Sequence, residues 1–125
     1  MSMQRHEMIA WLGDDHGLTD EQITDLMREA DEIGRRYPDP DDQQERDAAL
    51  YAAYELMVHD PGQVIDEQAE LITRGRILER RGLAGARQTV ITLARAGRIN
   101  ESDLARRLGV DRMAVRDWLG KRGPR

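Results

Sequence analysis

The chain has 125 residues, 39% of them hydrophobic and 34% charged, which fits one compact domain or two small ones. It has no cysteine, which excludes a disulfide scaffold, a thiolate metal site and a cysteine nucleophile, and no apolar run approaches the roughly 20 residues of a membrane span. The formal charge of −5 divides into −14 over residues 1–72 and +9 over residues 73–125, which indicates a basic segment that meets a polyanion, or two solvated surfaces that attract each other.

The first part of the chain carries helical signals and no sustained strand-like alternation. Residues 8–12 predict a short first helix. A capping box of Thr19 and Gln22 begins a second helix, which ends near Tyr37 because Pro38 cannot continue it. The apolar face of this second helix is expected to consist of Ile23, Leu26, Met27, Ala30 and Ile33.

Two further helices follow before residue 82. The acidic pair Asp41 and Asp42 favours the start of the third, whose buried stripe is Ala49, Leu50, Ala53, Tyr54 and Met57. Asp60 is a candidate N-cap with Pro61 at the first helical position of the fourth, which we expect to end near Gly82. A stripe of residues at three- and four-residue spacing runs along it, consisting of Val64, Gln68, Leu71, Gly75 and Leu78. This stripe covers only about two heptads, so core packing is favoured over a dimer seam.

In the last part of the chain, the sequence predicts three shorter helices. The first spans about residues 86–96, with Val90 on its buried face and Gly97 as its C-cap. Two more fall within residues 101–120, where Asn100 and Asp111 are candidate N-caps. The predicted fold class is therefore all-α.

A regular spacing of small and apolar side chains within residues 101–120 carries the functional prediction. The set is Leu104, Ala105, Leu108, Gly109, Val110, Val115 and Trp118. With about residues 84–122 around it, this pattern resembles the helix-turn-helix DNA-binding motif of bacteria and phages. Ala105 is small where two helices cross closely, and Gly109 accepts the positive φ of the turn. The apolar members of the set are expected to fill the wedge between the helices.

The charge division and the resemblance together predict an acidic helical domain over residues 1–82 and a helix-turn-helix domain with a basic tail over residues 83–125. The resemblance also implies that the second helix of the motif lies in the major groove of double-stranded DNA. The side chains expected to read bases are Arg112, Met113, Arg116 and Asp117. Those expected to bind phosphates are Arg98, Arg106, Arg107, Lys121 and Arg122. Arginine suits base reading because its guanidinium can bond to both O6 and N7 of guanine.

The sequence predicts no catalytic site, no metal site and no cofactor. His6, His16 and His59 are scattered, and the segment from Asp14 to His16 fits a solvated polar turn better than a metal site. The glycine-rich residues 82–85 lack the lysine of a phosphate-binding loop. We therefore expect a protein that is not an enzyme.

The leading prediction is a small transcriptional regulator or repressor that binds double-stranded DNA as a homodimer. Its acidic N-terminal domain would supply dimerisation or bind a partner protein. Two alternatives stay open: a non-catalytic DNA-handling adaptor for recombination or packaging, and a protein-binding module with an acidic N-terminal half. Lys121 is the only lysine, and arginine codons are GC-rich, which favours a GC-rich bacterial or phage genome. We expect no membrane association and a location in the bacterial nucleoid or the cytoplasm of a phage-infected host.

Overall fold

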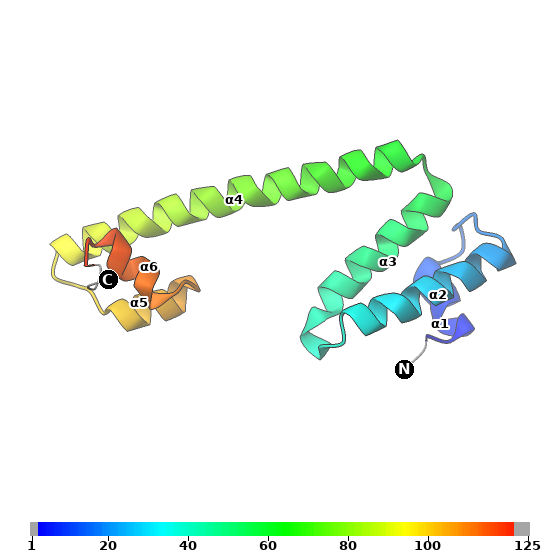
Figure 1. Cartoon of the computed structure of the whole chain (residues 1–125), viewed down its shortest axis with the longest axis horizontal. Coiled ribbons are helices and arrows are strands. Elements are labelled where there is room, and N and C mark those ends of the chain that lie inside the picture. Colours follow the sequence, from blue (N-terminus) through cyan, green and yellow to red (C-terminus); the bar gives the residue numbers. More distant parts are fainter. Residues whose placement is uncertain (1–2, 122–125) are drawn as a thin grey trace. The chain divides into compact units, whose positions relative to one another are not determined.

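The computed structural model describes residues 3–121, and every regular element within that range is helical (Figure 1). The elements are α1 (Arg5–Leu12), α2 (Asp20–Arg36), the 3-10 turn η1 (Pro40–Asp42), α3 (Gln43–Val58), α4 (Pro61–Arg95), α5 (Glu101–Leu108) and α6 (Arg112–Trp118). The all-α prediction is confirmed for this range. None of these helices is both long and apolar enough to cross a membrane.

The contacts divide the chain into two compact units, Met1–Ala69 and Glu70–Arg125, which we call the N-terminal and C-terminal units. The division falls inside α4. The domain boundary expected after residue 82 also falls inside this helix, which runs unbroken past that position (Figure 1).

The N-terminal unit is built on α1, α2 and α3. The expected capping box is present: the Gln22 amide donates to Oγ1 of Thr19 over 3.2 Å, and the Thr19 amide donates to Oε1 of Gln22 over 2.9 Å. The helix that it begins ends at Arg36 with Tyr37 as its C-cap, which matches the predicted end near Tyr37. The amphipathic α2 then buries its apolar face against the other two helices, because only that face carries side chains that gain from leaving water.

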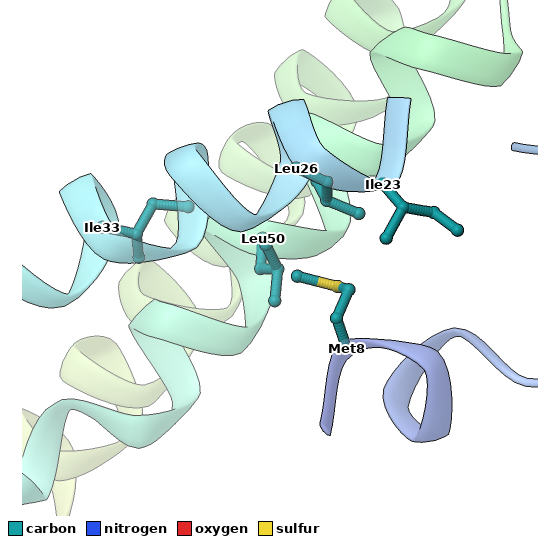
Figure 2. Packing of buried hydrophobic residues seen from close by; sticks show 5 residues of the cluster. All are labelled: Met8, Ile23, Leu26, Ile33 and Leu50. Atoms are coloured by element: carbon teal, nitrogen blue, oxygen red, sulfur yellow. The ribbon is translucent and has the colours of Figure 1, made fainter. Parts of the chain in front are cut away.

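The core of the N-terminal unit gathers one or more side chains from each of the three helices. Its buried members are Met8, Ile23, Leu26, Ile33 and Leu50. Figure 2 shows Met8 of α1 pointing toward Leu50 of α3 and Leu26 of α2. Met8 and Leu26 are completely buried, so these two side chains hold the contact between the helices.

The connection between α2 and α3 is held by one arginine. The Arg46 guanidinium donates to the Tyr37 carbonyl over 2.6 Å and to the Asp39 carbonyl over 2.7 Å. These carbonyls belong to the residues that directly precede Pro38 and Pro40, just after α2 ends. The charged side chain of Arg46 on α3 therefore bonds to the backbone of the turn that connects α2 to α3.

The helix α4 differs from the two separate helices that we expected over this stretch. It continues from Pro61 to Arg95 through Gly75, Gly82 and Gly85. A glycine inside a helix costs only about 1 kcal/mol relative to alanine, whereas proline costs about 3 kcal/mol and removes a donor. No proline follows Pro61 before residue 95, so nothing in this stretch forces the helix to end.

The prediction that the stripe on α4 packs into a core is also wrong over most of the helix. Val64 is buried near the start of the helix, but every residue from 69 to 85 is exposed. Leu71 and Leu78 keep 59% and 65% of their surface in contact with solvent. An apolar stripe becomes core only where another element lies against it, and no other element of residues 70–121, the described part of the C-terminal unit, covers this stretch.

The C-terminal unit has its own small core at the end of α4 and on α5 and α6. Val90 and Val115 are completely buried, and Ala105 is 5% exposed. The half-buried side chains that pack against them are Ile99, Leu104, Val110, Trp118 and Leu119. Leu108 was expected in this wedge but is exposed. It stands at the last position of α5, directly before the left-handed Gly109 that ends the helix.

Candidate nucleic-acid interface

The candidate interface is formed by α5, α6 and the short turn that joins them. The Asn100 side chain accepts from the Asp103 amide over 2.9 Å, and the Asp111 side chain accepts from the Met113 amide over 2.8 Å. Both expected N-caps are thereby confirmed. Gly109 ends α5 with a φ of 69°, a left-handed conformation that costs an L side chain energy. The caps and this glycine fix where each helix begins and ends.

The buried residues Ala105 and Val115 set the rotation of α6 about its axis. Because Val115 points into the core, the residues on the other side of α6 point toward solvent. Arg112 and Asp117 are exposed, Met113 is 51% exposed, and Arg116 is half-buried. These four positions follow one another at spacings of one and three residues, so they share one face of the helix.

A single carboxylate on α5 contacts two basic residues from the end of the chain. Nη1 of Arg116 donates to Oε2 of Glu101 over 3.3 Å, and Nζ of Lys121 donates to Oε1 of the same residue over 3.1 Å. The Glu101 side chain is only 13% exposed, and that of Arg116 is 33% exposed. Arg116, which was expected to read bases, is held against α5 by this contact.

The surroundings of Glu101 favour its charged form. The hydrogen bond from Lys121 is the largest cause that lowers the pKa of this carboxyl below its usual 4.5, and the positive charges of Arg116 and Arg112 add to it. Partial burial acts in the opposite direction but is outweighed. Glu101 is thus a carboxylate that holds the side chains of Arg116 and Lys121 in place.

The expected phosphate-binding residues lie on different elements. Arg98 follows α4, Arg106 and Arg107 lie in the last turn of α5, and all three are exposed. Arg106 forms an ion pair with Asp103 one turn earlier. Lys121 follows α6 and bonds to Glu101, whereas Arg122 lies outside the described residues. The structure therefore brings Arg116 and Lys121 together and leaves Arg98 and Arg107 facing solvent.

The sequence analysis did not single out Glu101. Its partners are 15 and 20 residues away, beyond the reach of any helical repeat. The only available signal was its position, because an acidic residue in the first turn of a helix faces the positive end of the helix dipole.

We expect acid to weaken the ion pairs that Glu101 forms with Arg116 and Lys121. Because the pKa of Glu101 is lowered by folding, its contribution to stability is complete above pH 4.5 and is lost as the pH falls through the lowered value. The melting temperature of the C-terminal unit should therefore fall in that acid range, and Glu101→Gln should flatten this part of the profile. Trp118 fluorescence in a Trp11→Phe background reports on this unit.

The control for this measurement is Glu79→Gln, which removes an exposed carboxylate from α4. It should keep the acid dependence of the unsubstituted protein. Equal flattening by Glu79→Gln and Glu101→Gln would contradict the anchoring role of Glu101.

His16 and His59 take structural positions. Nδ1 of His16 accepts from the Leu18 amide over 2.9 Å, and its carbonyl accepts from the Tyr54 hydroxyl over 2.9 Å. Nε2 of His59 lies 3.2 Å from Oε2 of the buried Glu55, four residues earlier in the chain. Within residues 3–121 no three His, Asp or Glu side chains gather closely enough to hold a metal ion.

The chain was compared with protein-family models, with curated proteins and with solved structures, and none of the three comparisons found a match.

Proposed function

We propose that the C-terminal unit binds double-stranded DNA as a helix-turn-helix, with α6 in the major groove, and that the protein is a small transcriptional regulator. The observation that carries the proposal is the outward face of α6, formed by Arg112, Met113, Arg116 and Asp117 and held in register by the buried Val115. A major groove admits one α-helix, and base edges are read by the side chains on its outward face.

The chemistry of that face suits base reading. Arg112 is exposed and can bond to O6 and N7 of one guanine, while Met113 offers apolar surface to a thymine methyl group. Asp117 can accept from the amino group of cytosine. These contacts distinguish base pairs, so the proposal includes sequence preference as well as affinity.

Electrostatics supports the same proposal. Residues 73–125 carry a charge of +9, and DNA binding draws much of its affinity from phosphate neutralisation. Arg98 and Arg107 are exposed and available for phosphates. Residues 1–72 carry −14, which would keep the N-terminal unit away from DNA and leave it to contact a partner protein.

The test is binding of the full chain to random-sequence duplex DNA, measured by fluorescence anisotropy over a series of salt concentrations. We expect binding at low salt, with the logarithm of the binding constant falling by about 0.9 per logarithm of salt for each neutralised phosphate. No binding to random duplex at low salt, or binding that salt does not weaken, would overturn the proposal.

We expect Arg107→Ala to weaken binding to all duplexes by a similar factor. Arg107 is exposed at the end of α5, where it can reach a phosphate but belongs to no base-reading face. The salt slope should become shallower by about 1. Arg35→Ala, which removes an exposed arginine from α2, is the matched control and should leave slope and affinity unchanged. An altered ranking of duplexes in Arg107→Ala would contradict the phosphate role.

One observation favours a second candidate function. The exposed apolar face along α4 suits a protein that builds an assembly, as a DNA-handling adaptor for recombination or packaging would. The mass of the particle in solution separates the two candidates. A dimer favours the regulator, and a ring of many subunits favours the adaptor.

A further inference from the structure

A cavity of about 450 Å³ lies within the N-terminal unit, between α1, α2 and α3. Apolar side chains from these helices and from the segment before α1 line it: Met3, Trp11, Ala30, Ile33 and Leu50. Ile33 and Leu50 also belong to the buried core of the unit (Figure 2), so the cavity borders that core. Its volume falls in the range of small-molecule sites in proteins, which is roughly 300–1,000 Å³.

Gly34 leaves the cavity open on the side of α2. It lines the cavity, and a Cβ built on it would meet nothing within 4 Å among the described residues, apart from its own stretch of helix. The segment before α1 is bonded to the same helix, because the Met3 amide donates to Oδ1 of Asp31 over 3.3 Å. The space beside Gly34 is therefore a hollow between bonded elements, and a larger side chain at this position would fill it.

Two carboxylates around the cavity can accept hydrogen bonds from a ligand. Glu7 of α1 and Asp47 of α3 both line the cavity, and both are exposed. Oε1 of Glu7 accepts from the Gln4 amide over 3.1 Å. Oδ1 of Asp47 accepts from the Gln43 side chain over 2.8 Å. Within residues 3–121 these bonds use one oxygen of each carboxylate, which leaves the second oxygen of each for a donor on a ligand.

The basic residue of the lining, Arg46, has already committed its donors. Its Nη1 donates to the carbonyls of Tyr37 and Asp39. Its Nη2 donates to the Pro40 carbonyl over 3.4 Å and to Oε1 of Gln43 over 3.0 Å. An anion bound here would have to displace these bonds, whereas a cation would meet two carboxylates with free lone pairs. The polar part of the lining therefore favours a cation.

We propose that this cavity binds a small organic amine in its protonated form, with an apolar body and one ammonium group. The apolar body lies against Trp11, Ile33 and Leu50, where it leaves water. The ammonium group donates to Glu7 and Asp47. The strongly negative charge of the N-terminal unit draws such a cation toward it. The inference does not rest on DNA binding, because every residue that carries it belongs to the N-terminal unit.

The test follows Trp11 fluorescence of the full chain in a Trp118→Phe background, because Trp11 lines the cavity. Three probes with a closely similar apolar body are added in turn: phenethylamine, phenethyl alcohol and phenylacetate, which carry a positive, a neutral and a negative head. We expect saturable binding of the amine, about three- to tenfold tighter than that of the alcohol, because exposed ion pairs add a modest free energy. Phenylacetate should bind most weakly.

The order of the three affinities decides the proposal. Equal affinity for the amine and the alcohol, tighter binding of phenylacetate, or no saturable binding of the amine would overturn it. Amine affinity that falls as the protein concentration rises would show that a second copy of the chain fills the cavity, which would also overturn it.

The role of the two carboxylates is tested by Glu7→Gln combined with Asp47→Asn, which removes both charges but keeps an oxygen acceptor at each position. This chain should bind the amine and the alcohol within about twofold of each other. Glu29→Gln combined with Glu32→Gln is the matched control, since it changes the net charge equally at exposed positions of α2 outside the lining. Equal loss of amine preference in both chains would show general attraction to an acidic unit and would contradict a site.

The position of the ligand is tested by Gly34→Leu. Leucine has a higher helix propensity than glycine, so α2 should be kept, and its side chain enters the hollow. Affinity for the amine should fall about tenfold or more, because a filled cavity must repack to admit a ligand. Gly75→Leu, at a glycine of α4 with equally open surroundings, should bind like the unsubstituted chain. Undiminished binding in Gly34→Leu, or an equal loss in Gly75→Leu, would overturn the proposal.

Discussion

Replacing Arg116 by alanine should relax base preference at one position of the preferred duplex, by about 5- to 150-fold, which corresponds to about 1–3 kcal/mol. The reason is that Arg116 lies on the outward face of α6, where its guanidinium can address a base edge. The preferred duplex is first selected from random oligonucleotides, and dissociation constants are then measured for all four base pairs at each position. Arg116→Lys should behave like the alanine variant, because lysine keeps the charge but lacks the planar fork.

Substitution of Glu101 gives a second test of base reading by Arg116. If the ion pair over 3.3 Å positions Arg116, then Glu101→Gln should weaken preference at the same base pair as Arg116→Ala. In the Arg116→Ala background, Glu101→Gln should add little, because residues that act through one another are not additive. A uniform loss of affinity for every duplex in Arg116→Ala would contradict base reading by this residue and leave that role to Arg112 and Met113.

In the proposed DNA binding, the Glu101 contact would have two opposing effects. A guanidinium held in place loses less conformational freedom when it meets a base, which favours binding. The same carboxylate offsets part of the positive charge of Arg116 and Lys121, which reduces attraction to phosphates. The first effect concerns discrimination between sequences, and the second concerns affinity for any sequence, so the two are separable in the measurements above.

The largest expected effect on stability comes from Leu26→Ala in the N-terminal unit. Leu26 is fully buried between the three helices, so its truncation removes apolar contacts and leaves a cavity (Figure 2). Such a substitution costs about 2–5 kcal/mol of the free energy of unfolding. Leu56→Ala on α3 is the matched control, since Leu56 is 50% exposed and should change stability by less than about 1 kcal/mol.

The two tryptophans allow this loss to be assigned to one unit. Trp11 packs against the core of the N-terminal unit and Trp118 against that of the C-terminal unit. Urea unfolding followed by fluorescence in Trp118→Phe and Trp11→Phe backgrounds therefore reports the units separately. Leu26→Ala should shift the Trp11 transition to lower urea and leave the Trp118 transition in place. An equal shift of both transitions would show that the units unfold together.

Local sequence signals were sufficient for the starts of three helices and for the turn between α5 and α6. The caps at Thr19, Asn100 and Asp111 depend on a side chain and an amide only two or three residues away. The left-handed turn at Gly109 depends on one residue without a Cβ. The core of the N-terminal unit also matches its predicted stripes, because the apolar faces of α2 and α3 are marked by helical periodicity.

The sequence by itself determined the helical class, the caps and the positions of small and apolar residues around Ala105 and Gly109. Only the tertiary structure decided that α4 runs through Gly82, that Leu71 and Leu78 stay in water, and that Leu108 lies outside the C-terminal core. It alone placed Glu101 against Arg116 and Lys121. The physical reason is range: a cap or a glycine turn is settled within one turn of helix, whereas burial and ion pairing depend on which distant segment comes to lie alongside.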